Sequence, residues 1–305
     1  MPYAGEVAAL ATAACWSCTT LLFTFVVERV GAFGLNLLRI TGAALLLTIL
    51  TLLSVAIGPL PGAPVLEATH GITAHALWLL AWSGWIGLTA GDWAYLKSLH
   101  LLGPRIATLV SALAPPLAAA LGAAFLGETL GARGVLGMGL TLAGIALVVL
   151  ERGSDPAPRG HRIRGTVFGV LGALAQAVNL VLSKFALAGG IGPLPAAATR
   201  MVAAALGVWL LLLLTRRRIP IRELRVDRRV PAALVAAIVF GPVTGIWLSL
   251  IAVQRTQTGI AATLMSLVPV LVLPLVVVFR HERVTARGVL GALVAVGGVA
   301  VLFSR

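Results

Sequence analysis

The six residues Ala-Arg-Gly-Val-Leu-Gly occur twice in this chain, at 132–137 and again at 286–291. The two copies lie 154 positions apart in a chain of 305 residues, and each begins an apolar stretch. An identity of this length at this distance indicates an internal duplication. The hexapeptide therefore predicts a chain that is built from two related halves.

Residues on both sides of the hexapeptide also match at the offset of 154, and no gap is needed. Nearer the start of each half the offset becomes 160 or 161. The matched pairs are Gly5 and Gly165, Arg39 and Arg200, Trp93 and Trp247, Pro115 and Pro269, and Glu128 and Glu282. We therefore predict a first repeat over 1–151, a linker over 152–163 and a second repeat over 164–305.

The composition is that of a membrane protein. Hydrophobic residues make up 59% of the chain and charged residues only 11%, whereas soluble domains carry about 25% charged residues. A bilayer-spanning helix needs roughly 20 apolar residues, and this chain has several uncharged runs of that length: 7–27, 106–127, 230–254 and 256–279.

Ten segments meet the length needed to span a bilayer, five in each half. They are 5–27, 33–57, 76–97, 103–126, 132–151, 164–188, 194–215, 230–254, 258–279 and 286–303. Because five is odd, the two halves must enter the membrane in opposite orientations. The sequence thus predicts an all-α membrane protein of ten transmembrane helices, arranged as two inverted five-helix repeats around a central cavity.

The basic residues support this inversion. Of the 23 Lys and Arg residues, 18 fall in or beside alternate gaps between the segments. Loop 216–229 holds seven of them, whereas the corresponding loop 58–75 holds none. By the positive-inside rule, loop 216–229 is cytoplasmic and both termini lie outside, in a plasma (inner) membrane. The basic residues flank helices and form no nucleic-acid-binding face.

Polar side chains within apolar segments are costly and usually face a bundle interior or a wet cavity. On the sixth segment, Gln176, Asn179 and Ser183 share one helical face. At the offset of 160, Trp16 and Thr19 of the first segment occupy the corresponding face. These five residues are candidates for the lining of a substrate cavity, although hydroxyl groups also serve as interhelical hydrogen-bond partners.

A second face is predicted on the third segment and its counterpart, the eighth. An α-helical spacing aligns the indole and polar side chains there, and a flat amphipathic surface suits an organic ligand. The candidate lining residues are Trp82, Trp85, Thr89 and Trp93, with Thr244 and Trp247 from the eighth segment.

Asp92 is the one acidic residue well inside an apolar segment. It could couple transport to protons or pair with a substrate ammonium. It could also form an ion pair with Arg39, which lies near the start of the second segment, on the side of the membrane where the third segment ends. Arg39 and Arg200 lie early in matched helices, where arginines snorkel or guard the mouths of a cavity.

Prolines interrupt one helix in each half, and the two helices are equivalent. Pro115 and Pro116 lie within the fourth segment, and Pro269 and Pro274 lie within the ninth. Proline removes a backbone donor and kinks a helix. Their equivalent placement predicts a pair of gating kinks.

Together these features resemble the EamA-type transporters of the drug/metabolite transporter superfamily. The resemblance covers the whole chain, including the turn Leu126-Gly127-Glu128-Thr129-Leu130 and its degraded counterpart Arg280-His281-Glu282-Arg283-Val284. It implies a ten-helix bundle with a central cavity and alternating access. Members of this family usually have cytoplasmic termini, whereas the distribution of charge here indicates the reverse.

The function that we predict is secondary transport or export of a small, amphipathic, amino-acid-like metabolite across the inner membrane. The partners are therefore the solute and the lipid bilayer. A passive channel and a membrane-embedded enzyme are the alternatives, but the sequence has no catalytic constellation. We expect no cofactor and no metal site, because the five histidines are scattered among the loops.

Overall fold

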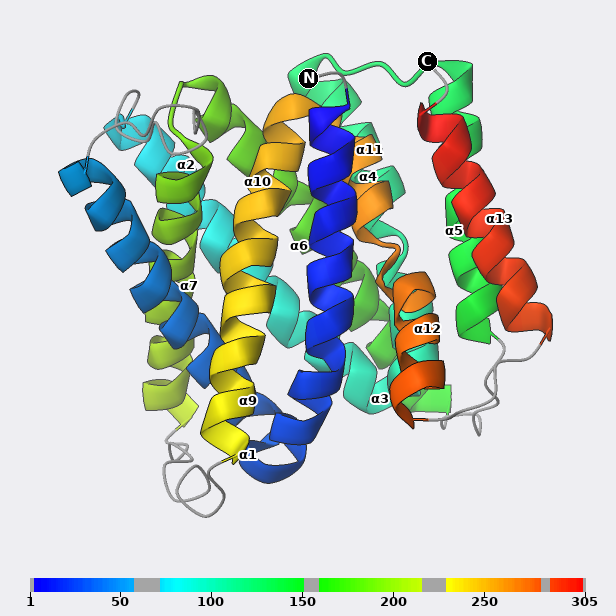
Figure 1. The fold of residues 1–305 in the computed structure, drawn as a ribbon, viewed down its shortest axis with the longest axis horizontal. Coiled ribbons are helices and arrows are strands. Elements are labelled where there is room, and N and C mark those ends of the chain that lie inside the picture. The colour runs from blue at the N-terminus through cyan, green and yellow to red at the C-terminus, as the bar shows by residue number, and fades with distance from the viewer. Residues whose placement is uncertain (1–2, 58–71, 151–158, 216–228, 281–285, 304–305) are drawn as a thin grey trace.

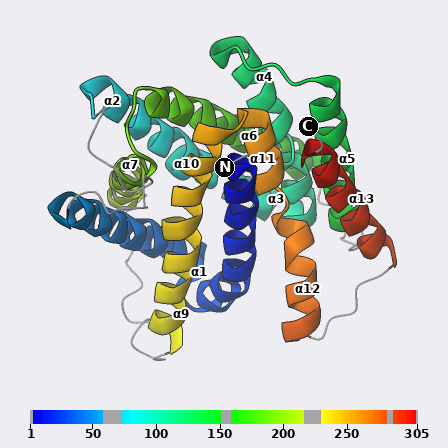
Figure 2. The same ribbon diagram turned by 45° about the horizontal axis from the view of Figure 1, so that its top comes forward.

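The computed structural model describes residues 3–57, 72–150, 159–215, 229–280 and 286–303, and all regular elements in these ranges are helices. Figures 1 and 2 show them packed side by side as a bundle. The helices of the first half are α1 (Ala4–Ile57), α2 (Ala74–Ser83), the π-helix η2 (Gly84–Gly91), α3 (Asp92–Ser111), α4 (Ala114–Leu126) and α5 (Ala132–Leu150).

The second half repeats this order. Its helices are α6 (Arg159–Ala188), α7 (Pro193–Thr215), α9 (Arg229–Ile238), the π-helix η3 (Val239–Gly245), α10 (Ile246–Arg255), α11 (Thr258–Met265), α12 (Val268–Arg280) and α13 (Ala286–Phe303). The two π-helices occupy equivalent places, because an offset of 154 carries 85–91 onto 239–245.

α1 contains the first two predicted segments, joined at Gly31. The φ of Gly31 is 72° and lies outside the helical region, a conformation that only glycine adopts at little cost. The chain turns sharply there, at the bottom of Figure 1. Ala4–Val27 and Phe33–Ile57 are therefore two separate spans.

Within the described ranges, nine helices are long and apolar enough to cross a bilayer. The third predicted segment is also helical, but it is divided among α2, η2 and the start of α3. The chain is thus an all-helical membrane protein with five helical segments in each half.

The two halves run in opposite directions. In Figure 1, the Phe33–Ile57 segment of α1 rises to the upper left, whereas its equivalent, α7, descends. The contacts of equivalent glycines confirm the symmetry. A Cβ at Gly5 would touch Thr256, and a Cβ at Gly165 would touch Leu102, which is the equivalent of Thr256.

α5 and α13 pack against one another at one side of the bundle (Figure 1). Their backbones are in close contact at four glycines, which form two equivalent pairs. Gly144 faces Gly291 and Ala295 of α13, and Gly298 faces Gly137 and Thr141 of α5. Glycines at such positions allow helices in a membrane to approach closely.

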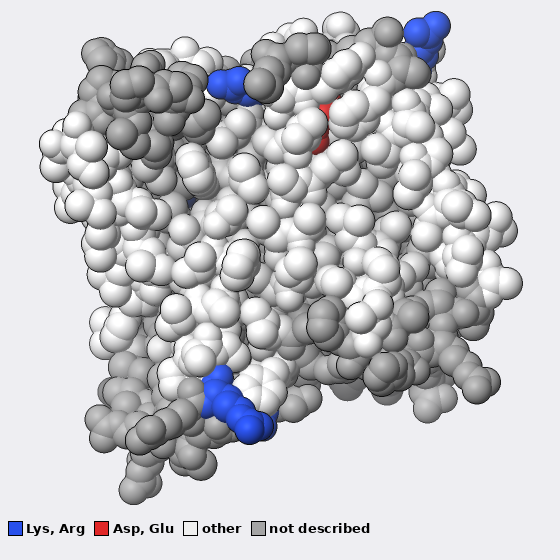
Figure 3. Space-filling view, in the orientation of Figure 1, with Lys and Arg blue, Asp and Glu red and all other residues white. Residues whose placement is uncertain are grey.

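The outer surface has the polarity that a bilayer requires. On the face shown in Figure 3, Lys and Arg side chains gather near the two ends, and a broad uncharged band separates them. Large apolar side chains are exposed on several helices, among them Leu52, Leu206, Leu213 and Leu293. These side chains would contact lipid tails.

Two predicted boundaries need correction. α6 begins at Arg159, so residues 159–163 of the predicted linker belong to a helix; a transmembrane helix can extend into water with polar turns. α3 continues through 98–102, which was expected to separate two segments. The rest of the linker, loop 216–228 and the terminal residues 1–2 and 304–305 lie outside the described residues.

Candidate functional site

A cavity of about 330 Å³ lies between the two halves. Its lining comes from helices of both repeats, whereas α5 and α13 contribute none of the described lining residues. The polar and charged lining residues are Thr12, Arg39, Asp92, Ser111, Gln176, Asn179, Arg200, Ser249 and Ser266, and Trp16 and Pro115 are also present.

The lining includes equivalent positions of the two repeats. Arg39 and Arg200 form one such pair, and Asp92 and Ile246 form another. This is the arrangement expected of a binding site between inverted repeats. The pairs differ in chemistry, however, so the cavity is symmetric in its framework and asymmetric in its charge.

Arg39 and Asp92 form an ion pair inside the cavity. Arg39 Nη2 donates to Asp92 Oδ2, and Arg39 Nε donates to Asn36 Oδ1 at 2.9 Å. The two charged side chains are 19% and 18% exposed. The structure thus places Asp92 beside Arg39, in the ion pair that was one of the alternatives from the sequence. The charges of the two side chains cancel.

Two amide side chains of α6 extend this ion pair across the cavity. Gln176 Nε2 lies 3.5 Å from Asp92 Oδ1 and 3.4 Å from the carbonyl oxygen of Gly87. Asn179 Nδ2 donates to Gln176 Oε1 at 3.0 Å, and Asn179 Oδ1 accepts a hydrogen bond from Arg200 Nη2. A continuous polar chain therefore joins Arg39 of the first repeat to Arg200 of the second.

Arg200 was not among the residues predicted to line the cavity; it was expected either to snorkel or to guard a mouth of the cavity. It is only 3% exposed, and its Nε and Nη1 have no hydrogen-bond partner among the described residues. The available signal was its match to Arg39 together with Ile246 at the position equivalent to Asp92. Arg200 therefore lacks, at the position equivalent to Asp92, the acid that neutralises Arg39.

Glycines in the two π-helices hold the cavity helices close together. A Cβ at Gly87 of η2 would overlap the side chain of Asn179, and a Cβ at Gly241 of η3 would lie 3.2 Å from Thr19. Gly87 matches Gly241, and Asn179 matches Thr19. The same contact is therefore made twice, once on each side of the symmetry axis.

The structure places the predicted lining residues Trp82, Trp85 and Trp93 outside the described lining of this cavity. Their side chains are 42%, 41% and 46% exposed, and none is among the described lining residues. Trp82 and Trp85 pack edge to face at 6.2 Å between ring centroids. The α-helical spacing fails here because η2 is a π-helix, which holds more residues per turn, so Trp85 and Asp92 face different directions.

Five further candidates also lie outside the described lining. The hydroxyl groups of four of them bond to backbone carbonyls: Thr19 to Trp16 at 3.0 Å, Ser183 to Asn179 at 2.7 Å, Thr89 to Ala204 at 3.2 Å and Thr244 to Val239 at 2.8 Å. Trp247 packs against the apolar core, and its buried Nε1 has no hydrogen-bond partner among the described residues. Satisfied hydroxyl groups explain these positions without a ligand.

The predicted kinks lie beside real breaks in the helices. The regular helix is interrupted by a turn at 112–113, just before Pro115 and Pro116, and again at the equivalent 266–267, just before Pro269. Pro274 lies inside α12. Pro115 lines the cavity, and so does Ser266 of the second break.

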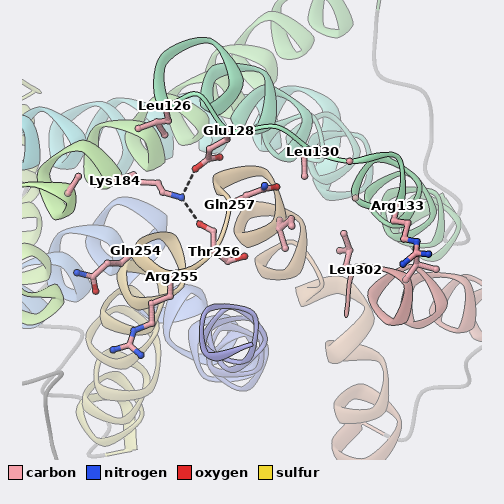
Figure 4. Close-up of a pocket in the computed structure, with 15 residues that line it drawn as sticks. Leu126, Glu128, Leu130, Arg133, Lys184, Gln254, Arg255, Thr256, Gln257 and Leu302 are labelled. Carbon is pink, nitrogen blue, oxygen red and sulfur yellow. Dashed lines mark hydrogen bonds and ion pairs between the residues drawn. The ribbon is translucent and has the colours of Figure 1, made fainter. Parts of the chain in front are cut away.

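A second pocket, of about 640 Å³, opens at one end of the bundle (Figure 4). Beside it four residues, which we call the end cluster, join the repeats: Glu128, Lys184, Thr256 and Thr258. Glu128 pairs with Lys184 and accepts hydrogen bonds from the N–H of Thr258 at 2.7 Å and from its hydroxyl group at 2.9 Å. Lys184 also donates to the carbonyl of Thr256.

Local geometry presents Glu128 to this cluster. Gly127 ends α4 with a φ of 65°, the left-handed conformation that terminates many helices and favours glycine. The chain reverses there and directs the carboxylate towards α6 and α11. In the sequence the Gly-Glu turn is recognisable only as a feature shared with a family, and this role of Glu128 was not predicted.

Metal ligands do not gather in the described ranges, where no three His, Cys, Asp or Glu side chains come together. Cys15 and Cys18 are free thiols. The described lining of the cavity offers charged groups, amide groups and apolar surface.

Comparisons with known proteins agree with this architecture. The model of the EamA-like transporter family matches residues 3–150 and 163–304. Twenty-nine chains of solved structures match. One of them, described as "Crystal structure of protein", has a TM-score of 0.79 and 23% identity, covering 99% of this chain and 97% of that one. No curated protein matches the chain.

Proposed function

The chain belongs to the EamA-like transporter family, and we propose that it is a secondary transporter that moves a small amphipathic metabolite by alternating access. One observation carries this proposal: the cavity between the inverted repeats is lined by a polar chain to which both repeats contribute. Cavities at repeat interfaces are where secondary transporters bind their solutes.

The breaks before Pro115 and Pro269 support movement around this cavity. They interrupt equivalent helices, and residues at both breaks line it. Bending at one break would open the cavity towards one side of the membrane, and bending at the other would open it towards the opposite side. The exported or imported solute would thus meet the same binding groups from either direction.

Counterflow in proteoliposomes tests the proposed transport. Vesicles are preloaded with an unlabelled mixture of amino acids and small organic acids and diluted into the same mixture, with one solute labelled at a time. A carrier gives a transient, saturable accumulation of its labelled solute. Flux that does not saturate and shows no overshoot would instead indicate the alternative, a passive channel.

We expect Gln176→Ala to reduce exchange by at least about 10-fold, because it removes the bridge between Asp92 and Asn179. The measurement is the initial rate of counterflow at equal amounts of reconstituted protein. Thr51→Ala is the matched control, since the Thr51 hydroxyl only bonds to the carbonyl of Leu47 within its own helix. Trp85→Ala should also retain exchange. Equal loss in all three variants would contradict the assignment of the cavity.

We further propose that loop 216–229 is cytoplasmic and that both termini lie outside, in a plasma (inner) membrane. The bias of 18 in 23 basic residues supports this orientation. Arg39 and Arg200 lie in the cavity rather than at the membrane surface, and leaving both out does not change the direction of the bias.

A reporter fused after Arg305 tests the orientation. We expect alkaline phosphatase, which is active only outside the cytoplasm, to be active at this position, and a fluorescent protein that folds only in the cytoplasm to be dark. Fusions within 216–229 serve as the control and should give the opposite result. If the phosphatase fused after Arg305 is inactive and the fluorescent protein fused there is fluorescent, the assigned orientation is reversed.

A further inference from the structure

The described lining of the cavity carries an unbalanced positive charge. Arg39 and Arg200 are its two basic residues, and Asp92 is the one acidic residue among the described lining residues. Asp92 is paired with Arg39. Arg200 is therefore left with the neutral side chain of Asn179 as its hydrogen-bond acceptor.

This arrangement is costly in the absence of a ligand. A guanidinium stays charged in proteins, so Arg200 cannot lower the cost by losing its proton. A charge buried without a counter-ion disfavours the folded state. Arg200 is 3% exposed, and two of its nitrogens have no partner among the described residues. Because Arg200 also lines the cavity, a ligand bound there could supply the missing partner.

We propose that Arg200 binds the carboxylate of a small organic anion, which is the transported solute. This inference rests on the proposed transport function and names the chemical class of the solute. It also gives the two equivalent arginines different roles. Arg39 is neutralised permanently by Asp92, whereas Arg200 is neutralised only when the solute is bound.

The donors of Arg200 suit a carboxylate. A guanidinium has two edges, and each presents one hydrogen of Nη2 beside a hydrogen of either Nε or Nη1. Asn179 Oδ1 accepts from Nη2, while Nε and Nη1 are both unpartnered, so one edge keeps two parallel donors. Two such donors match the two oxygens of a carboxylate.

The rest of the cavity sets the size and polarity of the solute. Its volume of about 330 Å³ is at the lower end of the range for ligand pockets. Trp16, Met201 and Met265 contribute apolar surface to the lining. A compact aliphatic or aromatic carboxylate therefore fits better than a large or strongly polar solute.

The same contacts argue against a solute that depends on a cationic group. An ammonium would need a free carboxylate, but Asp92 already accepts hydrogen bonds from Arg39 and Gln176. A positively charged solute would also be repelled by the unpaired Arg200. We therefore expect anions to be preferred over amines, and over amides of the same shape.

A matched series of probes tests this preference in the wild-type protein. Phenylacetate, phenylacetamide and 2-phenylethylamine have nearly the same shape and carry a negative, zero and positive charge, and 4-methylpentanoate supplies an aliphatic carboxylate. We expect the carboxylates to raise the thermal unfolding temperature and to exchange in counterflow. The amide and the amine should be at least about 10-fold weaker, because the charge-assisted hydrogen bonds are lost.

Variants of Arg200 test whether this residue is the cause. Arg200→Gln should abolish the preference for carboxylates over amides, and Arg200→Lys should restore part of it. Arg162→Gln is the matched control, since Arg162 is an exposed arginine at the start of α6. In the absence of probe, Arg200→Met should raise the unfolding temperature, because it removes an unpaired buried charge; a purely structural arginine would show the opposite effect.

The outcomes separate this inference from the proposed function. If Arg200→Gln retains the preference for carboxylates, or if amides bind as well as carboxylates, the inference is wrong and the transport proposal stands. Absence of any thermal shift with both carboxylates also overturns the inference. If the carboxylates stabilise the wild-type protein but not Arg200→Gln, and no solute shows counterflow, the anion site stands and the transport proposal fails.

Discussion

Replacing Asp92 alone by alanine should destabilise the protein by about 3 kcal/mol, because it leaves the Arg39 guanidinium buried without its counter-ion. This value is at the lower end of the range of about 3–5 kcal/mol for broken buried ion pairs, since both side chains are about one-fifth exposed. Replacing both residues, as Arg39→Met with Asp92→Ala, should recover most of the loss. Thermal and denaturant unfolding in detergent would measure the stability of the wild-type protein, of Asp92→Ala and of the double variant.

Lys97→Ala is the matched control for this cycle. Lys97 is an exposed charge on the same helix, α3, and a surface substitution usually changes stability by no more than about 0.5 kcal/mol. If Asp92→Ala were as stable as the double variant, Asp92 would not be needed to neutralise Arg39. The alternative, proton coupling, would then gain weight; it predicts that Asp92→Asn abolishes pH-driven transport while leaving exchange intact.

Gly298→Ala should destabilise the protein by about 3 kcal/mol or more, although only one methyl group is added. A Cβ at this position would overlap the backbone nitrogen of Thr141 and approach the carbonyl oxygen of Gly137 to 2.8 Å. Neither atom can move without displacing α5 from α13. Overpacking usually costs about 1–3 kcal/mol, and a clash with backbone belongs at or above the top of that range.

The adjacent residue supplies the control. A Cβ at Gly297 would have no neighbour within 4 Å, and alanine has a higher helix propensity than glycine by up to about 1 kcal/mol. Gly297→Ala should therefore leave stability unchanged or raise it slightly. The readout is the fraction of monodisperse protein after solubilisation, followed by the unfolding temperature. If the two substitutions behaved alike, the proposed close contact between α5 and α13 would not exist in the membrane.

Most of the fold could be predicted from the sequence, because hydropathy and the internal repeat are strong signals. Residues such as Pro115 and Pro269 match at an offset of 154, which indicated equivalent helices in both halves. Because each half has five spans, the two halves had to enter the membrane in opposite orientations. The boundaries of individual helices were less accurate. α6 extends past the predicted start because a polar turn at Arg159 can be helical in water, where hydropathy is uninformative.

The candidate site was predictable only in part, because the direction in which each side chain points depends on the local backbone geometry. Gln176, Asn179, Asp92 and Arg39 lie on ordinary α-helices, and the structure brings them together. Trp85 faces outward because η2 follows a different helical period, and a single sequence does not reveal where that period changes. The partners of Arg200 depend on contacts between helices that are far apart in the chain.

The end cluster has a chemical asymmetry with a consequence for the transport cycle. At the offset of 154, Thr258 corresponds to Pro104, which has neither an N–H nor a hydroxyl group, and at 160 Lys184 corresponds to Thr24, which has no charge. The first repeat therefore lacks the ammonium, N–H and hydroxyl donors that the second repeat offers to Glu128. If the carrier alternates between two open states, we expect the end cluster to stabilise only one of them, because no equivalent cluster would stabilise the other.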